Sequence, residues 1–199
     1  VGHTGMVSSA SFSPNGDHVV TASDDGIIRI FDAESGKELS SLFGHRSIVW
    51  MTLFSPDGNK ILTAGVDHTA RLFNVHTGEE LYKLQDHTDE VTIAQFSPDG
   101  QYLLTAGKDK TCRIYLTKSG ELLHTLNAHT DYITSAMYSP PTEANPSGGK
   151  HILTASEDGT ALIYDAATGE VAKTLSGHTL GLRSAEYSPD GKSILTSSK

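Results

Sequence analysis

The sequence predicts an all-β fold, and two observations support this prediction. First, a group of motifs recurs with a fixed period of 42 residues, lengthened once to 49, and each copy begins at a histidine: His3, His45, His87, His129 and His178. Second, each period holds four short apolar runs separated by turn sequences, and no stretch has a convincing helical spacing of apolar residues. A period of this length is typical of repeat architectures, in which one unit is a small group of strands.

The first period shows how the strands are predicted. Its apolar runs indicate strands over residues 7–12, 18–22, 27–31 and 38–42. The sequences between them are S-P-N-G at 13–16, D-D-G at 24–26 and S-G at 35–36. Proline fixes φ at the second position of a turn, and Asn-Gly or Asp-Gly supplies the left-handed positions of a tight reversal. Four strands joined by such turns predict an antiparallel meander.

The later periods repeat this pattern with one insertion. S-P-D-G returns at 55–58, 97–100 and 188–191. In the fourth period, residues 141–149 are rich in Pro and Gly and account for the seven extra residues, which predicts a longer exposed loop. We therefore expect a single repeat array over residues 1–199, with repeats at 1–43, 44–85, 86–127 and 128–176 and a partial repeat at 177–199.

The repeats favour a β-propeller. A lone four-stranded meander cannot bury both faces, so such units stack, and radial stacking leaves only short strand edges. The chain resembles the WD-repeat family in its Gly-His pairs at 2–3, 44–45 and 177–178, its T-A-S/G-x-D segments, and its aromatic-Asp strand ends at 31–32 and 164–165. We expect four full blades plus two strands of a fifth. Because propellers of this family have about seven blades, we also expect the chain to be part of a longer propeller.

The resemblance implies a structural hydrogen-bond network in each blade, formed by the His, a Ser or Thr of the second strand, the turn Asp and a third-strand Trp. Carried over by position, its members are His3, Thr21 or Ser23, and Asp25; His45, Thr63 and Asp67; His87, Thr105 and Asp109; His129, Thr154 or Ser156, and Asp158; and His178. A buried carboxylate needs a partner, which an imidazole N–H supplies.

The chain departs from the family at the aromatic position of this network. No repeat has the Trp; Phe31, Phe73, Tyr115 and Tyr164 occupy its place. Phenylalanine has no hydrogen to donate, so the first two networks should end one bond early, whereas tyrosine keeps a hydroxyl.

The same residues do not favour catalysis or metal binding. A His, a Ser and an Asp also occur in hydrolase triads, but a nucleophilic triad has no reason to recur four times in phase. Histidines placed in separate blades lie too far apart to share one ion. Cys112 has no second cysteine beside it and fits a small buried hydrophobe. We expect no catalytic residues, no metal and no cofactor.

Composition narrows the class of protein further. The formal net charge of −9 and the absence of a basic cluster argue against nucleic-acid binding. A single cysteine fits a reducing compartment. No signal-peptide pattern and no apolar run of membrane-spanning length is visible. These features favour a cytoplasmic protein without membrane insertion.

Partner binding is predicted where the repeats differ on the rim that carries the His and Asp turns. The candidate partner-binding residues are Met6, Asp24, Arg46, Ile48, Trp50, Val66, Glu90, Lys108, Tyr132 and Glu157. Aromatic residues and Arg dominate binding hot spots, which favours Trp50, Tyr132 and Arg46. The alternative for Ile48 and Trp50 is that they pack against a neighbouring blade.

The function expected from the sequence is a non-catalytic scaffold that docks partner proteins or peptides on this rim, as part of a multiprotein complex. The alternative is a sensor or regulatory module of a larger signalling enzyme, such as a kinase or a nucleotide-driven switch. A P-loop or kinase motifs in a longer sequence would favour that alternative.

Overall fold

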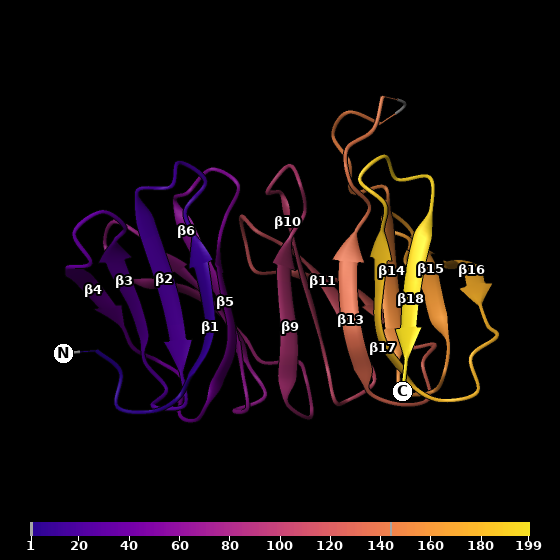
Figure 1. Ribbon diagram of the computed structural model, residues 1–199, viewed down its shortest axis with the longest axis horizontal. Coiled ribbons are helices and arrows are strands. Elements are labelled where there is room, and N and C mark those ends of the chain that lie inside the picture. Colours follow the sequence, from indigo (N-terminus) through magenta and orange to yellow (C-terminus); the bar gives the residue numbers. More distant parts are fainter. Residues whose placement is uncertain (1, 144) are drawn as a thin grey trace. The chain divides into compact units, whose positions relative to one another are not determined.

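The computed structural model describes residues 2–143 and 145–199, and every regular element in these residues is a β-strand (Figure 1). The all-β prediction is therefore confirmed. The chain forms two compact units, one ending at Ala94 and the other beginning at Gln95. Each unit is described by itself below.

The described residues form four four-stranded sheets and one strand pair, as predicted. The first sheet contains β1 (Val7–Phe12), β2 (His18–Ser23), β3 (Ile28–Asp32) and β4 (Glu38–Leu42). The second contains β5 (Val49–Phe54), β6 (Lys60–Gly65), β7 (Ala70–Asn74) and β8 (Glu80–Leu84). The third contains β9 (Val91–Phe96), β10 (Tyr102–Gly107), β11 (Cys112–Leu116) and β12 (Leu122–Leu126). The fourth contains β13 (Ile133–Tyr138), β14 (His151–Ser156), β15 (Ala161–Asp165) and β16 (Val171–Leu175). The strand pair is β17 (Leu182–Tyr187) and β18 (Ile194–Ser198).

The strands of each sheet follow one another in chain order and are antiparallel, so each sheet is a meander. The turns from first to second and from third to fourth strand therefore lie at one end of a sheet, which we call the turn rim. The turn from second to third strand, with the His-containing segment before the first strand, lies at the opposite end, which we call the His/Asp rim.

Hydrogen bonds within the S-P-D-G segments explain why these residues form the first turn of a repeat. In the second sheet the Ser55 hydroxyl donates to the Asp57 carboxylate, and the Gly58 N–H donates to the Ser55 carbonyl at 2.9 Å. The Ser55 side chain also accepts the Lys60 N–H at 2.9 Å. Gly58 has a φ of 73°, a left-handed conformation that glycine adopts without steric cost. The motif therefore positions the second strand directly beside the first.

The core of each unit lies between facing sheets. In the first unit, residues of the first sheet such as Ile28 and Leu42 pack against Val49 and Phe54 of the second. In the second unit, Leu153 of the fourth sheet packs with Leu182 of β17. A single sheet cannot cover its own apolar faces. Contact with the face of the next sheet therefore buries these side chains.

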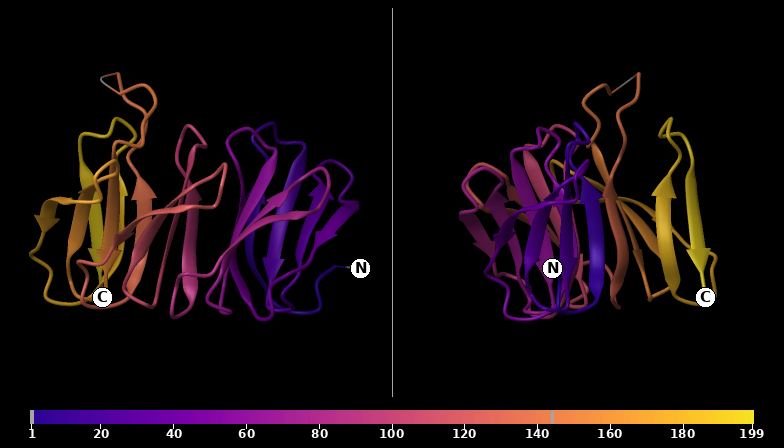
Figure 2. Two further views of the ribbon diagram at one scale, coloured as in Figure 1. Left: turned by 180° about the vertical axis from the view of Figure 1, so that it is seen from behind. Right: turned by 60° about the vertical axis from the view of Figure 1, so that its left-hand side comes forward.

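The insertion of the fourth repeat forms the predicted loop between β13 and β14, on the turn rim of the second unit. The loop projects beyond the neighbouring turns of its unit (Figures 1 and 2). Thr142 and Asn145 exchange two backbone hydrogen bonds, of 2.9 and 3.1 Å. Ala144, inside the predicted loop, and Val1, at the start of the predicted first repeat, lie outside the described residues.

Candidate functional site

The structure brings the His, the second-strand Thr and the turn Asp of the second repeat into one hydrogen-bonded group. His45 Nδ1 lies 2.9 Å from Asp67 Oδ1, and His45 Nε2 lies 2.7 Å from Thr63 Oγ1. The imidazole of His45 and the side chain of Thr63 are fully buried. A neutral ring that donates from Nδ1 to the carboxylate accepts the Thr63 hydroxyl at Nε2, so both ring nitrogens are satisfied.

The first and fourth repeats form the same group. His3 Nδ1 lies 3.1 Å from Asp25 Oδ2, and His129 Nδ1 lies 2.9 Å from Asp158 Oδ2. In both repeats the ring contacts a threonine hydroxyl through Nε2 at 2.7 Å, and these threonines are Thr21 and Thr154. Threonine rather than serine is thus the partner of the ring in these repeats.

The serines that the sequence left as alternatives have another contact. The buried Ser23 and Ser156 accept the backbone N–H of Asp25 and Asp158, at 3.2 and 3.1 Å. Ser156 also donates to the Asp131 carbonyl at 2.9 Å. These serines therefore fix the turn that carries the carboxylate.

In the third and fifth repeats, the His and the second-strand Thr occupy the same positions of the repeat as in the other three. His87 and Thr105 are buried, and Asp109 accepts the N–H and the hydroxyl of Thr111 at 3.0 and 2.8 Å. His178 Nε2 lies 2.9 Å from Thr196 Oγ1, but here the imidazole is exposed.

Three of the four aromatic residues of the third strand are buried. Phe73, Tyr115 and Tyr164 are buried, whereas Phe31 is half-buried. Burial raises the pKa of Tyr164 to about 12, although hydrogen bonds that involve Ala128 and Thr154 oppose this change.

A third-strand arginine, which the sequence analysis did not single out, joins the group in the second repeat. Arg71 is buried, and its guanidinium lies 3.4 Å from Asp67 Oδ2 and 2.5 Å from Glu80 Oε2. Arg29 donates to Glu38 Oε1 at 2.8 Å in the first repeat. The signal was present in the sequence, because Arg29, Arg71 and Arg113 each follow the turn Asp by four residues.

Hydrogen bonds keep the turn carboxylates ionised. Burial acts to raise the pKa of Asp25, but donation from the Thr4 and Ile27 N–H groups and from His3 outweighs it and holds this pKa at about 2. Asp158 has a pKa of about 2 for the same reasons, with Thr160, Thr130 and His129 as donors. Each carboxylate therefore carries its negative charge at neutral pH.

This arrangement is suited to holding a sheet together rather than to chemistry. The imidazoles of His45 and His129 have almost no exposed surface, both of their nitrogens are engaged, and Thr63 and Thr154 are buried with them. A nucleophile and a base must reach a substrate, which these side chains do not. Within residues 2–143 and 145–199, no three His, Cys, Asp or Glu side chains are placed to bind one metal ion.

The candidate partner-binding residues of the first unit differ in exposure. Met6 and Arg46 are exposed, while Asp24, Ile48 and Val66 are half-buried. Trp50 is half-buried, and its Nε1 donates to Glu90 Oε2 at 3.1 Å, so these two candidates contact each other.

In the second unit Tyr132 is the exposed candidate, whereas Lys108 and Glu157 are half-buried. The Glu157 carboxylate lies 2.8 Å from the Lys199 ammonium. The pairings of Trp50 with Glu90 and of Glu157 with Lys199 join residues about 40 positions apart, and no local pattern in the sequence indicates them.

The backbone next to each His is tied to the buried group. The N–H of the residue after the His donates to the turn Asp in three repeats: Thr4 to Asp25 at 2.9 Å, Arg46 to Asp67 at 3.1 Å, and Thr130 to Asp158 at 3.0 Å. In these three repeats the half-buried turn carboxylates therefore fix the backbone of the His/Asp rim.

Comparison with protein families matches the chain to the family described as WD domain, G-beta repeat, over residues 1–32, 36–74, 78–115, 120–165 and 169–199. These segments cover most of the chain and follow its five repeats. No curated protein matches the chain. No helix long and apolar enough to span a membrane occurs in the described part of the chain.

Proposed function

Because the chain belongs to the WD-repeat family, whose repeats generally serve as protein-interaction scaffolds, we propose that it is a non-catalytic scaffold that docks a partner protein or peptide on the His/Asp rim. The proposal separates two tasks: the recurring buried groups stabilise the sheets, and the residues that vary between repeats contact the partner.

The observation that carries the proposal is the position of Tyr132. Its side chain is 45% exposed, yet its backbone is held on both sides. Its N–H donates to Asp131 Oδ1 at 2.8 Å, and its carbonyl accepts the Glu157 N–H at 2.9 Å. An exposed aromatic ring on a fixed backbone loses little conformational entropy on binding, as is typical of hot-spot residues.

Arg46 of the first unit supports the same role. Its side chain is exposed, while its N–H is bonded to the half-buried Asp67 carboxylate. Arginine presents several donors in a fixed planar geometry and is enriched among residues that dominate binding energy.

The test is affinity capture of partner proteins with wild type and single variants, followed by affinity measurement for each recovered partner. Tyr132→Ala should weaken partner binding about thirtyfold or more, because truncation of a hot-spot residue costs about 2 kcal/mol or more. Val171→Ala is the matched control, because Val171 is 43% exposed in the same unit but lies at the turn rim. Equal affinity of both variants would contradict docking at Tyr132, and far-UV circular dichroism checks that both are folded.

A further inference from the structure

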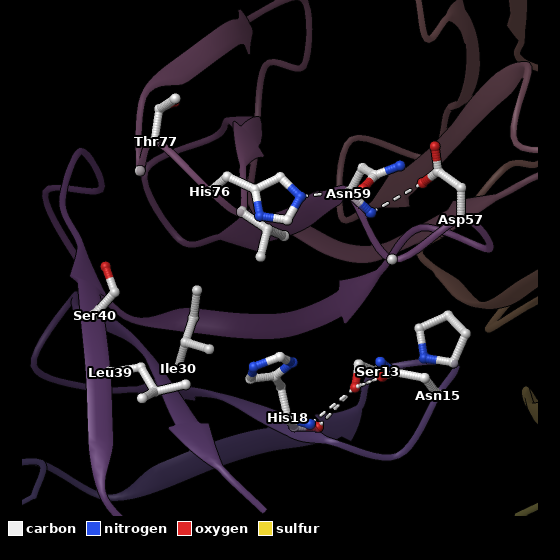
Figure 3. A pocket seen from close by; sticks show the side chains of 14 residues that line it. Ser13, Asn15, His18, Ile30, Leu39, Ser40, Asp57, Asn59, His76 and Thr77 are labelled. Atoms are coloured by element: carbon white, nitrogen blue, oxygen red, sulfur yellow. Dashed lines mark hydrogen bonds between the residues drawn. The ribbon is translucent and has the colours of Figure 1, made fainter.

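A hollow of about 500 Å³ lies at the turn rim of the first unit, between its first and second sheets (Figure 3). Its apolar part is formed by Ile30, Leu39 and Val75. Leu39 is an exposed leucine, so this apolar surface is open to a ligand from solvent. None of these residues takes part in the His/Asp groups described above.

Two imidazole rings border the hollow on opposite sides. His18 is the first residue of β2, and His76 lies in the turn between β7 and β8; Figure 3 shows both rings directed into the space between them. His76 Nε2 lies 3.2 Å from Asn59 Oδ1, which orients that ring. Among the described residues, none forms a hydrogen bond to the His18 ring.

An ionised carboxylate, that of Asp57, also lines the hollow, and Asn59 lies between it and His76 (Figure 3). Burial acts to raise the pKa of Asp57, but hydrogen bonds from Ser55 and from Asn59 outweigh it and hold this pKa at about 2. The Ser55 hydroxyl and the Asn59 N–H bind Oδ1, the Lys60 ammonium lies 3.7 Å from Oδ2, and the side chain is 53% exposed. Asp57 can therefore accept further hydrogen bonds from a cation. It is the only Asp, Glu, Lys or Arg among the described residues that line the hollow.

We propose that this hollow binds an arginine side chain of a partner protein. The methylene groups of arginine fit the apolar surface of Ile30 and Leu39, while the charged end remains hydrated at the opening. The guanidinium is planar and weakly hydrated, so it stacks on aromatic rings and donates hydrogen bonds to a carboxylate such as Asp57. The negative net charge of the chain attracts a cationic partner segment. This site lies at the turn rim and is independent of docking on the His/Asp rim.

The second unit contains a corresponding hollow with different chemistry. It measures about 370 Å³ and is lined by Tyr102, Ile114 and Leu123, where the first has His18, Ile30 and Leu39. Its lining also includes the exposed Lys150, which follows the insertion of the fourth repeat, and the carboxylate of Asp165. The Lys150 ammonium repels a guanidinium and competes with it for this carboxylate. Among its described lining residues the hollow of the first unit has no Lys or Arg, so we expect arginine to bind more tightly there.

The test is a titration of the full chain with an acetylated and amidated Gly-Arg-Gly peptide, followed through the imidazole C–H signals in NMR spectra. We expect saturable shifts of the His18 and His76 signals, with no shift at His151, which begins β14 as His18 begins β2. The same peptide with citrulline, a neutral analogue of arginine, should not bind. Binding of the citrulline peptide, equal binding of a Gly-Lys-Gly peptide, or absence of shifts at both rings would overturn the proposal.

Substitution of the carboxylate separates recognition from turn stability. Asp57→Asn should weaken peptide affinity about tenfold, because it removes a charge-assisted hydrogen bond. Asp99→Asn is the matched control, because Asp99 makes the same turn contacts, with the Ser97 hydroxyl at 2.5 Å and the Gln101 N–H at 3.0 Å. It should leave affinity unchanged. Equal affinities of the two variants would contradict the role of Asp57 and refute the site.

Discussion

Replacement of Thr63 by valine tests the energetic contribution of its buried hydroxyl, which contacts His45 and also lies 3.3 Å from the Arg71 carbonyl oxygen. The side chains of Thr63 and His45 are fully buried, and the Thr63 hydroxyl lies 2.7 Å from His45 Nε2. Valine has nearly the same shape but no hydroxyl, so Thr63→Val leaves a buried ring nitrogen without a partner. An unsatisfied buried polar group costs about 1–3 kcal/mol. For a chain of this size, each kcal/mol lowers the Tm by about 2–4 °C.

The fifth repeat offers a matched control for this prediction. Thr196 lies 2.9 Å from His178 Nε2, but His178 is exposed, so water replaces the lost hydroxyl in Thr196→Val. That variant should lose less than about 0.5 kcal/mol. Urea unfolding followed by far-UV circular dichroism measures both changes. Fluorescence of Trp50 reports on the sheet that contains Thr63. Equal destabilisation of the two variants would refute the argument that burial determines how much this contact contributes to the free energy of unfolding.

Three further predictions concern pH, packing and thiol chemistry. Because the folded pKa of Asp25 and Asp158 is about 2, against 3.8 ordinarily, their stabilisation is complete above about pH 4 and lost as pH falls toward 2; a urea midpoint that stays constant from pH 6 to pH 2 would contradict this. Phe54→Ala should destabilise by about 3–5 kcal/mol and Phe12→Ala by less than about 1 kcal/mol, because Phe54 is 7% exposed and Phe12 68%; thermal unfolding distinguishes them, and equal losses would show that these exposures do not govern stability. Burial raises the pKa of the Cys112 thiol, so Ellman's reagent should react with it only after unfolding; rapid labelling of the folded chain would contradict its burial.

Turn chemistry made the strand boundaries of the fold predictable from the sequence. The predicted strands at 7–12 and 38–42 coincide with β1 and β4, and those at 18–22 and 27–31 differ from β2 and β3 by one residue. In each S-P-x-G turn the Gly N–H donates to the Ser carbonyl, so the first strand must end before this turn and the second must begin after it. Local residue preferences therefore determine these boundaries.

The contacts of the site were less predictable, because several depend on the positions of separate elements. Thr21 and Ser23 lie on the same face of β2, and only the location of the His3 ring decides which hydroxyl it contacts. Similarly, the hydrogen bond of Trp50 to Glu90 joins the second sheet to the segment before β9. These two residues lie 40 positions apart, so a pattern within one repeat cannot encode their contact.

Backbone conformation at the Asp turn shows the same limit. The residue after the turn Asp has positive φ in all four complete repeats. Glycine occupies it at Gly26 and Gly159, but His68 and Lys110 adopt φ of 63° and 69°. A side chain in this conformation costs about 1–2 kcal/mol. The fold imposes the conformation because the same hydrogen bonds to the Asp carboxylate must form in every repeat, whichever residue follows it.

The His-Asp motif therefore specifies which residues form hydrogen bonds, but not how much each hydrogen bond contributes to the stability of the fold. His45 and His178 both pair with a second-strand threonine, yet one ring is buried and the other exposed. The second sheet of the first unit has four strands, whereas the described residues of the last repeat provide only two. Since a hydrogen bond stabilises most where water cannot replace it, the surrounding strands determine how strongly each repeat is held.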